Sequence, residues 1–221
     1  MFEHTSRNYP MISHEEQELL KNTKVAIAGV GGIGSWVSDA LVRMGIGKFN
    51  IADLDLYEIH NLNRQEFSTV DTVGLPKVEV VVQNLERLNP EVDIRVFEKG
   101  VQDNNINEFL EDVDVVIDAV EYFEFHIRRL IQNKSREKNI PTFLNVVAGF
   151  NLALFTFSKD SMSFDEYIKF DSSCNESNFT MPFERTIPVF PTYMTEYLDP
   201  IIMEKIFRKE QPITNLCTAI A

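Results

Sequence analysis

Residues 24–34 read Lys-Val-Ala-Ile-Ala-Gly-Val-Gly-Gly-Ile-Gly, and this stretch decides the fold class. Its first five residues are mostly apolar, which is typical of a buried parallel strand, and the glycines allow a tight turn. Beyond the turn, apolar residues recur at helical spacing until Gly45, where we expect the helix to end. The stretch therefore predicts a strand, a glycine-rich turn and a helix, the first unit of a doubly wound sheet.

The same alternation continues along the chain. A short helix opened by Ser13 is predicted before the first strand. Strands and amphipathic helices are then predicted at 49–53, 78–88, 92–96, 113–119, 123–138, 142–148 and 152–158. Strands that alternate with helices predict an α/β fold with a Rossmann-like doubly wound sheet, parallel in its first half, with helices on both faces.

The character of the sequence changes after Ser158. Residues 1–158 are predicted to form the main domain, with residues 1–22 as an N-terminal arm. Residues 159–221 are predicted to form a C-terminal extension, first irregular because of its prolines and then helical around 200–209. We expect this extension to pack over the active site, because it is too short to form a core of its own.

Composition narrows the class of protein. The chain has 221 residues, 21 Lys and Arg against 34 Asp and Glu, and a formal net charge of -13, which disfavours binding to nucleic acid and to anionic lipid. Its two cysteines, Cys174 and Cys217, are too few for a four-thiolate zinc site. Apolar runs stay shorter than the roughly 18 residues of a membrane span. We expect a cytoplasmic protein with no zinc site and no membrane partner.

The glycine cluster is also the first candidate binding site. Backbone N–H groups at a helix N-terminus approach phosphate or adenosine closely where only glycine stands, and the cluster supplies Gly29, Gly31, Gly32 and Gly34. Asp53, at the end of the next predicted strand, suits ribose hydroxyls. A glycine turn that merely packs a strand on a helix is the alternative.

The residues that follow Asp53 are not those of a dehydrogenase. The chain reads Asp-Leu-Asp-Leu-Tyr-Glu-Ile-His-Asn-Leu-Asn-Arg-Gln at 53–65 and Asp-Ala-Val-Glu-Tyr at 118–122. Together with Arg-Met-Gly-Ile-Gly at 43–47, Gly-Leu-Pro-Lys at 74–77 and Asn-Pro at 89–90, these segments resemble the ThiF/MoeB/HesA family, the bacterial relatives of ubiquitin-activating enzymes. The resemblance covers residues 24–158 and implies ATP-dependent adenylation of a carboxylate.

Adenylation requires positioned cations around three phosphates. The segment beside the glycines offers Arg64 and Lys77 as cations and Asn61 and Gln65 as neutral donors. The resemblance implies that these four side chains face the phosphates of ATP. It places Asp55 in the same nucleotide-binding set.

The resemblance also assigns the adenosine side and the catalytic acid. It implies that Gly32 and Asp53 face the adenosine. Glu121 stands where the family has a catalytic Asp that binds Mg²⁺, and Asp118 is a second candidate ligand. Glu121 adds a methylene to that acid, and Tyr122 replaces the usual Asn, so two adjacent positions depart from the family pattern.

Two residues outside this core carry further hypotheses. Arg7 resembles the N-terminal arginine that the family inserts into the ATP site of the partner subunit, which implies a homodimer with Arg7 as a catalytic residue. Cys174 lies where several members carry a cysteine that receives the acyl group or engages sulfur. An ordinary cysteine without a catalytic role is the alternative.

Two groups of side chains are predicted to be structural. The aromatic residues of the extension are interpreted as the cover that attaches it to the main domain, at Phe179, Phe183, Phe190, Tyr193 and Tyr197. The cations of the helix at 123–138 are interpreted as a solvated face, at His126, Arg128, Arg129, Lys134, Arg136 and Lys138.

The sequence therefore predicts an enzyme that uses ATP and Mg²⁺ to adenylate a carboxylate, with release of pyrophosphate. The expected substrate is the C-terminus of a small ubiquitin-like or sulfur-carrier protein, or of a ribosomal peptide. Residues 34–36 and 43–47 also resemble the tRNA threonylcarbamoyladenosine dehydratase branch, whose partner is tRNA. A catalytically degenerate nucleotide-binding scaffold is a third reading, and a nicotinamide dehydrogenase is a weaker fourth.

Overall fold

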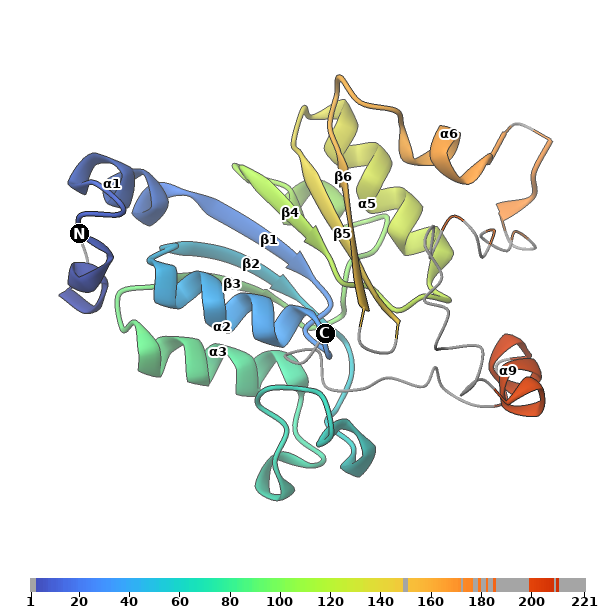
Figure 1. The fold of residues 1–221 in the computed structure, drawn as a ribbon, viewed down its shortest axis with the longest axis horizontal. Coiled ribbons are helices and arrows are strands. Elements are labelled where there is room, and N and C mark those ends of the chain that lie inside the picture. The colour runs from blue at the N-terminus through green and yellow to red at the C-terminus, as the bar shows by residue number, and fades with distance from the viewer. Residues whose placement is uncertain are drawn as a thin grey trace.

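A computed structural model describes residues 3–148, 151–171, 173–176, 179, 182, 185, 199–208 and 210. Six strands form one sheet in the order β3-β2-β1-β4-β5-β6 (Figure 1). They are β1 (Lys24–Ala28), β2 (Lys48–Ala52), β3 (Asp93–Phe97), β4 (Val115–Asp118), β5 (Thr142–Ala148) and β6 (Asn151–Phe157). The first five pair in parallel, and β6 runs antiparallel to β5. The predicted α/β class and Rossmann-like doubly wound sheet are confirmed.

The described helices are α1 (His14–Asn22), α2 (Gly34–Met44), α3 (Lys77–Leu88), α4 (Ile106–Phe109), α5 (Phe125–Glu137), α6 (Phe164–Ile168) and α9 (Pro200–Phe207). Short 3₁₀ helices lie at η1 (Glu3–Asn8), η2 (Ile59–Asn61) and η3 (Val70–Thr72). Ser13 caps α1 in a capping box with Glu16, as its position predicts. Gly45 ends α2 in the left-handed conformation at φ 97°.

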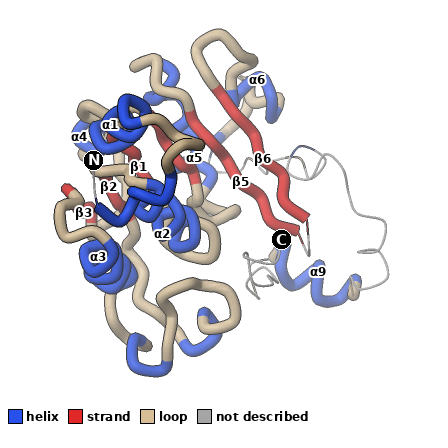
Figure 2. Tube along the Cα trace, turned by 60° about the vertical axis from the view of Figure 1, so that its left-hand side comes forward, coloured by secondary structure: helices blue, strands red, loops and turns tan. Residues whose placement is uncertain are grey.

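Helices cover both faces of the sheet, α2 and α3 on one and α4 and α5 on the other (Figures 1 and 2). Strand β1 contributes apolar side chains to the core on both faces of the sheet. Val25 and Ile27 belong to the apolar cluster that includes Val42 and Leu85, whereas Ala26 and Ala28 belong to the cluster on the other face. A strand buried on both sides has no polar face, which explains the continuous apolar run that reveals β1 in the sequence.

The described part of the extension packs on the β5–β6 hairpin. Phe164 and Ile168 of α6 form a third apolar cluster with Leu144 and Phe157. Residues 159–192 were expected to be irregular, and α6 corrects that expectation, because Ser163 and Glu166 form a capping box that starts this short helix.

The aromatic cover is only partly visible. Phe179 packs against the third cluster, in line with the expectation. Phe183, Phe190, Tyr193, Tyr197 and Cys217 lie outside the described residues. Among the helices that the structure describes, none combines the length and the apolar character needed to cross a membrane.

Candidate active site

The glycine-rich turn joins β1 to α2 at the carboxyl end of the sheet. A Cβ at Gly34 would lie 1.9 Å from the carbonyl oxygen of Gly29, so α2 starts closer to the turn than any other residue permits. Gly29 has φ 87°, and a Cβ there would lie 2.4 Å from the carbonyl oxygen of Ala119. The turn therefore brings α2 and the end of β4 together and leaves backbone groups exposed to a ligand.

Asp53 follows β2 and is fastened to the same turn. Its Oδ2 accepts the N–H of Val30 at 2.8 Å, and its Oδ1 accepts the N–H of Asp55 at 2.9 Å. Burial raises the pKa of Asp53, while the charge of Lys77 and the two N–H donors oppose that rise. The carboxylate is thus held at the end of β2 in a fixed orientation, facing the glycines.

Lys77 begins α3 and reaches back to the segment after β2. It is 6% exposed, and its Nζ donates to Asp55 Oδ2 at 2.8 Å. Its own N–H donates to Asp55 O at 2.9 Å. A cation at a helix N-terminus adds to the positive end of the helix dipole, so this corner attracts anions, and Asp55 balances it here.

The segment between β2 and α3 holds the three remaining donors. Asn61 is buried, and its Oδ1 accepts the N–H of Glu58, which closes the turn. Arg64 is fixed through its carbonyl, which accepts the indole N–H of Trp36 at 2.9 Å. Gln65 is 6% exposed, and its Oε1 has no partner among the described residues.

The side chain of Gln65 is directed at the glycine turn. A Cβ on Gly31 would lie 3.5 Å from its Nε2, so the missing Cβ leaves space between them. A buried acceptor without a partner is costly, and this one belongs to a side chain that lies beside Gly31. The polar groups here fit a ligand that carries hydrogen-bond donors.

Glu121 faces Arg64 from the neighbouring corner, after β4. Burial lowers the pKa of Arg64, and the charge of Glu121 opposes that change. Glu121 is exposed, and one of its carboxylate oxygens accepts the N–H of Tyr122 at 3.0 Å. The predicted acid and the predicted cation therefore lie near each other at one edge of the sheet.

Asp118 occupies a different environment. It is 0% exposed, its Oδ2 accepts the amide of Gln132 at 2.8 Å, and Arg128 Nε lies 3.4 Å from it. Arg128 also donates to the carbonyl of Val120. Both oxygens of Asp118 are thus occupied within the protein.

Two of the helix cations do not belong to the solvated face that the sequence suggested, whereas His126 and Lys138 are exposed. Arg128 is 3% exposed, and Arg129 is half-buried in ion pairs with Asp165 and Glu176. The helical spacing of α5 carries no signal that separates these two residues from Lys134, which is exposed to solvent in part and pairs with Glu137. Sequence reasoning missed Arg128 as the anchor of the Asp118–Val120 strand end.

Arg7 lies at the far end of α2 from the glycine turn, and Cys174 contacts Asp171. Arg7 is exposed on η1, which packs near the C-terminus of α2 through Asn8 Nδ2 and Met44 O. Helix α2 has 11 residues, so Arg7 lies about one helix length, roughly 16 Å, from its own glycine turn. Cys174 is half-buried, and its thiol donates to Asp171 at 3.7 Å.

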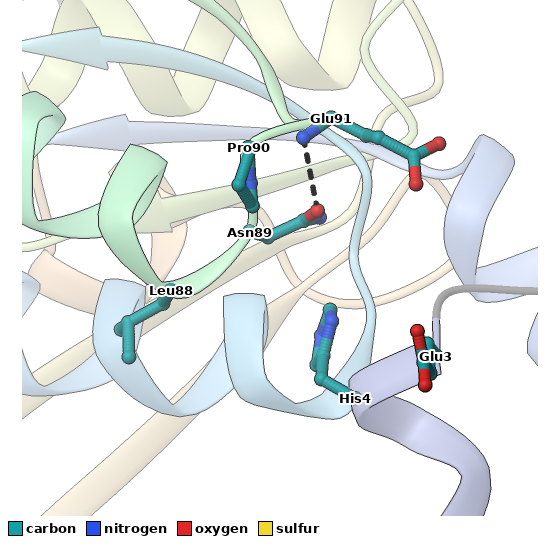
Figure 3. A pocket seen from close by; sticks show the side chains of 6 residues that line it. All are labelled: Glu3, His4, Leu88, Asn89, Pro90 and Glu91. Atoms are coloured by element: carbon teal, nitrogen blue, oxygen red, sulfur yellow. Dashed lines mark hydrogen bonds between the residues drawn. The ribbon is translucent and has the colours of Figure 1, made fainter.

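A shallow pocket of about 420 Å³ lies at the opposite end of α3 from Lys77 (Figure 3). Its lining residues are Glu3, His4, Leu88, Asn89, Pro90 and Glu91. None of these residues belongs to the predicted site. Within the described ranges, no three His, Cys, Asp or Glu side chains come together as a metal-binding group.

Comparison with known proteins identifies relatives of this arrangement. The chain is 34% identical to the tRNA threonylcarbamoyladenosine dehydratase of Bacillus subtilis over 142 residues, covering 64% of this chain and 55% of the relative. It is 35% identical to the sulfur carrier protein adenylyltransferase of Thermus thermophilus over 120 residues, covering 54% and 44%. Its fold resembles E. coli tRNA N6-threonylcarbamoyladenosine dehydratase in complex with ATP, with TM-score 0.60, 29% identity, and coverage of 67% and 60%.

The chain spans about half the length of these curated relatives. The model of the ThiF family matches residues 5–216, which is nearly the whole chain. The match includes the glycine turn, the segment between β2 and α3, and the β4–α5 corner. This protein belongs to the ThiF family.

Proposed function

We propose that this protein adenylates a carboxylate with ATP, as an adenylyltransferase of the ubiquitin-like modifier activating type. The carboxylate oxygen attacks the α-phosphorus, the bond from that phosphorus to the bridging oxygen breaks, and pyrophosphate leaves. The observation that supports the proposal is the fastening of Asp53 to the glycine turn, with the Lys77–Asp55 pair after the same strand and the charge of Glu121 acting on Arg64. An anion-attracting corner next to an acid suits phosphoryl chemistry.

The residues present fit a nucleotide. Gln65, whose Oε1 is unpaired among the described residues, lies beside Gly31 of the glycine turn, and Asp53 and Gly32 would meet the ribose and base. Lys77 would exchange its pair with Asp55 for a phosphate oxygen. Asn61, Gln65 and Arg64 would complete the phosphate contacts, and Gly29 and Gly34 would shape the turn.

Glu121 is the residue that we propose for Mg²⁺. Mg²⁺ usually takes one or two carboxylates and completes its shell with water and phosphates, and Glu121 is exposed. Bound there, Mg²⁺ would neutralise charge that builds up on the departing pyrophosphate. Asp118 would support this corner from within, because its oxygens already hold Gln132 and Arg128.

We propose a homodimer in which Arg7 completes the site of the partner subunit. Arg7 lies too far from its own glycine turn to act there. The segment that carries Arg64 exposes large apolar side chains, which suits a surface covered by a second copy, at Leu54, Leu56, Ile59, Val70, Val73 and Leu75. Both observations agree with composite sites.

Complementation tests the composite site. Arg7→Ala and Arg64→Ala each inactivate both sites of their own dimer. Mixed subunits restore one intact site per heterodimer, so an equal mixture recovers about a quarter of wild-type activity. A mixture as inactive as either variant alone would contradict the composite site.

The domain division stays part of the proposal. Residues 1–158 would form the adenylation domain, and residues 159–221 would pack over the active site and select the substrate. The proposed substrate is the C-terminus of a ubiquitin-like or sulfur-carrier protein, or a ribosomal peptide. The similarity to a sulfur carrier protein adenylyltransferase supports this class.

ATP–pyrophosphate exchange tests the proposal directly. We expect exchange with small carrier proteins or peptides that end in Gly-Gly. Arg64→Ala and Lys77→Ala should reduce it by about 10- to 100-fold, since each removes a hydrogen bond to a charged group, whereas Arg95→Ala, far from the site in a pair with Glu108, should not. Cys174→Ser should leave adenylation unchanged. Exchange that persists in both site variants would refute the phosphate contacts, and its absence in the wild type would favour a scaffold.

The similarity to tRNA threonylcarbamoyladenosine dehydratases supports a second candidate, the cyclisation of that tRNA nucleoside. Binding of tRNA needs clustered cations, but the net charge is -13, Arg128 is buried and Arg129 is engaged in ion pairs. We therefore rank it second. Filter binding to tRNA at two salt concentrations discriminates, and tight, salt-sensitive binding would reverse the order.

A further inference from the structure

Arg129 of α5 binds the C-terminal extension at three points. Its Nε and Nη2 donate to the two carboxylate oxygens of Asp165 at 2.9 and 2.8 Å. Its Nη1 donates to Glu176 at 3.3 Å, and its guanidinium stacks on Phe170 at 4.3 Å. A planar fork that pairs with one carboxylate in two places fixes orientation as well as distance.

His126, one turn earlier on α5, strengthens the same junction. Its Nε2 lies 2.9 Å from Asp103 Oδ2, and its Nδ1 lies 3.3 Å from Glu176 Oε2. Hydrogen bonds to both carboxylates raise the pKa of His126. We name Arg129, His126, Asp165, Phe170 and Glu176 the clamp, since they join α5 to the extension.

The clamp is continuous with the loop that carries Glu121. Phe125, the first residue of α5, packs its ring on Phe170 and Phe179 with centroids 5.7 and 4.7 Å apart. Tyr122 packs against the same apolar cluster. The backbone N–H of Tyr122 donates to Glu121, so the acid is bonded to a residue whose side chain packs against the cluster that the extension helps to form.

The loop at 119–124 depends on such contacts. Glu124, the N-cap of α5, makes no side-chain capping bond, and the start of this helix is held locally by its N–H, which donates to the carbonyl of Glu121 at 3.1 Å. Arg128 holds the carbonyl of Val120, the residue before Glu121, and pairs with Asp118. The aromatic contacts with the extension therefore act together with the hydrogen bond from Glu124 N–H to Glu121 O in fixing the second half of the loop.

We propose that Arg129 is a positioning residue for Glu121, which acts by clamping the extension onto α5 and so fixing the loop at 119–124. The proposal deepens the proposed function and rests on it for the role of Glu121. The extension would then affect the adenylation step, because it fixes the position of the Glu121 carboxylate. A displaced carboxylate binds Mg²⁺ poorly, since Mg²⁺ requires nearly octahedral coordination.

Hydrogen–deuterium exchange of the full chain tests the positioning without any substrate. In Arg129→Ala we expect amides at 119–124 to exchange about tenfold faster, while amides of β1 keep their protection. Arg129→Lys keeps the charge but loses the fork, and should recover only part of the protection. Lys134→Ala is the matched control, because among the described residues the Lys134 side chain pairs with Glu137 on its own helix.

Titration of ATP with and without Mg²⁺ supplies the second readout. Arg129→Ala should bind ATP alone as the wild type does, and should lose several-fold of the affinity that Mg²⁺ adds. Loop amides as protected as in the wild type, with faster exchange at 164–176, would overturn the proposal. If Arg129→Ala fails to fold, Asp165→Asn replaces it, because this change weakens the Arg129–Asp165 pair by removing the charge of its acid. The same two measurements then test the proposal.

The two proposals fail separately. A wild-type chain that does not bind ATP refutes the proposed function, while the exchange rates at 119–124 still decide whether the clamp fixes the loop. A wild-type chain that binds Mg²⁺-ATP, with an Arg129→Ala variant that is identical in both readouts, refutes only the positioning role.

Discussion

The two corners that face each other across the site are built in different ways. The β1–α2 corner is fixed by backbone: Gly29 and Gly34 allow approaches that a Cβ forbids, and Val30 N–H holds Asp53. The β4–α5 corner is fixed by side chains from distant parts of the chain, with Arg128 on Asp118 and Arg129 on Asp165. The β1–α2 corner should therefore tolerate no added side-chain atoms at its glycines. The β4–α5 corner, which carries the acid Glu121 and is called the acid corner below, should tolerate substitutions that preserve its ion pairs.

Gly34→Ala should have the largest effect. Its Cβ would lie 1.9 Å from a backbone oxygen that cannot move aside without separating α2 from β1, so we expect a loss of at least about 4 kcal/mol of unfolding free energy or failure to fold. Urea unfolding measures it. Gly74→Ala is the control, because Gly74 has φ 88° but open space around its Cα, and only the backbone penalty of about 1–2 kcal/mol applies. Equal losses in the two variants would contradict the steric argument.

Arg128→Ala should rank next. It leaves Asp118 as an unpaired charge in a buried site, which lowers the unfolding free energy by about 3–5 kcal/mol. The double variant Arg128→Met with Asp118→Asn removes both charges and should recover most of the loss. Thermal and urea unfolding compare the two. If the double variant is no more stable than Arg128→Ala, the loss comes from the missing contacts of the Arg128 side chain and not from the unpaired charge of Asp118.

The sequence predicted the first corner better than the second for a physical reason. The glycines and Asp53 follow neighbouring strands, so spacing places them together, whereas Lys77 was assigned to the site from the family resemblance. The role of Arg129 depends on Asp165, 36 residues away, and no periodicity indicates which helix cation has a partner. Helix α6 was missed although Ser163 and Glu166 form a recognisable capping box.

The fold was predictable to within a residue or two at most elements. The sequence predicted a strand at 49–53, and β2 is Lys48–Ala52; it predicted a helix at 78–88, and α3 is Lys77–Leu88. Burial on both faces produces apolar runs that end where the strands end, so these boundaries are visible in the residues. Helix α4 was missed because its four residues span barely one helical turn, and a helical pattern is recognised only when apolar residues repeat over several turns.

Glu121→Asp tests whether the acid corner tolerates a change that keeps its charge. If Glu121 holds Mg²⁺, shortening the side chain to the acid that the family uses should preserve or raise ATP–pyrophosphate exchange by up to a few-fold. Glu121→Gln keeps the length but removes the charge, and should lower exchange strongly. Complete loss in Glu121→Asp, with normal folding, would count against the alignment of Glu121 with the catalytic acid.

His126→Gln should have the smallest effect, and it is visible only as a pH dependence. The folded-state pKa of His126 is raised by Asp103 and Glu176, so its contribution is fully present below the ordinary value of about 6.5 and is lost as the pH rises through the raised value. The hydrogen bond with His126 lowers the pKa of Asp103. The contact between the two residues therefore weakens again in acid, as the pH falls through the lowered pKa of Asp103. Solvent screens this exposed pair, so its contribution is small.

Urea unfolding from about pH 5.5 to about pH 8.5 measures this window. The difference in stability between the wild type and His126→Gln should shrink toward the alkaline end, and Arg129, which shares Glu176 with His126, should keep the extension bound throughout. His60→Gln is the matched control, since His60 contacts Glu58 within its own turn. A difference that stays constant with pH would mean that His126 acts by packing alone, and the acid corner would then rest on Arg129 without a second, proton-dependent support.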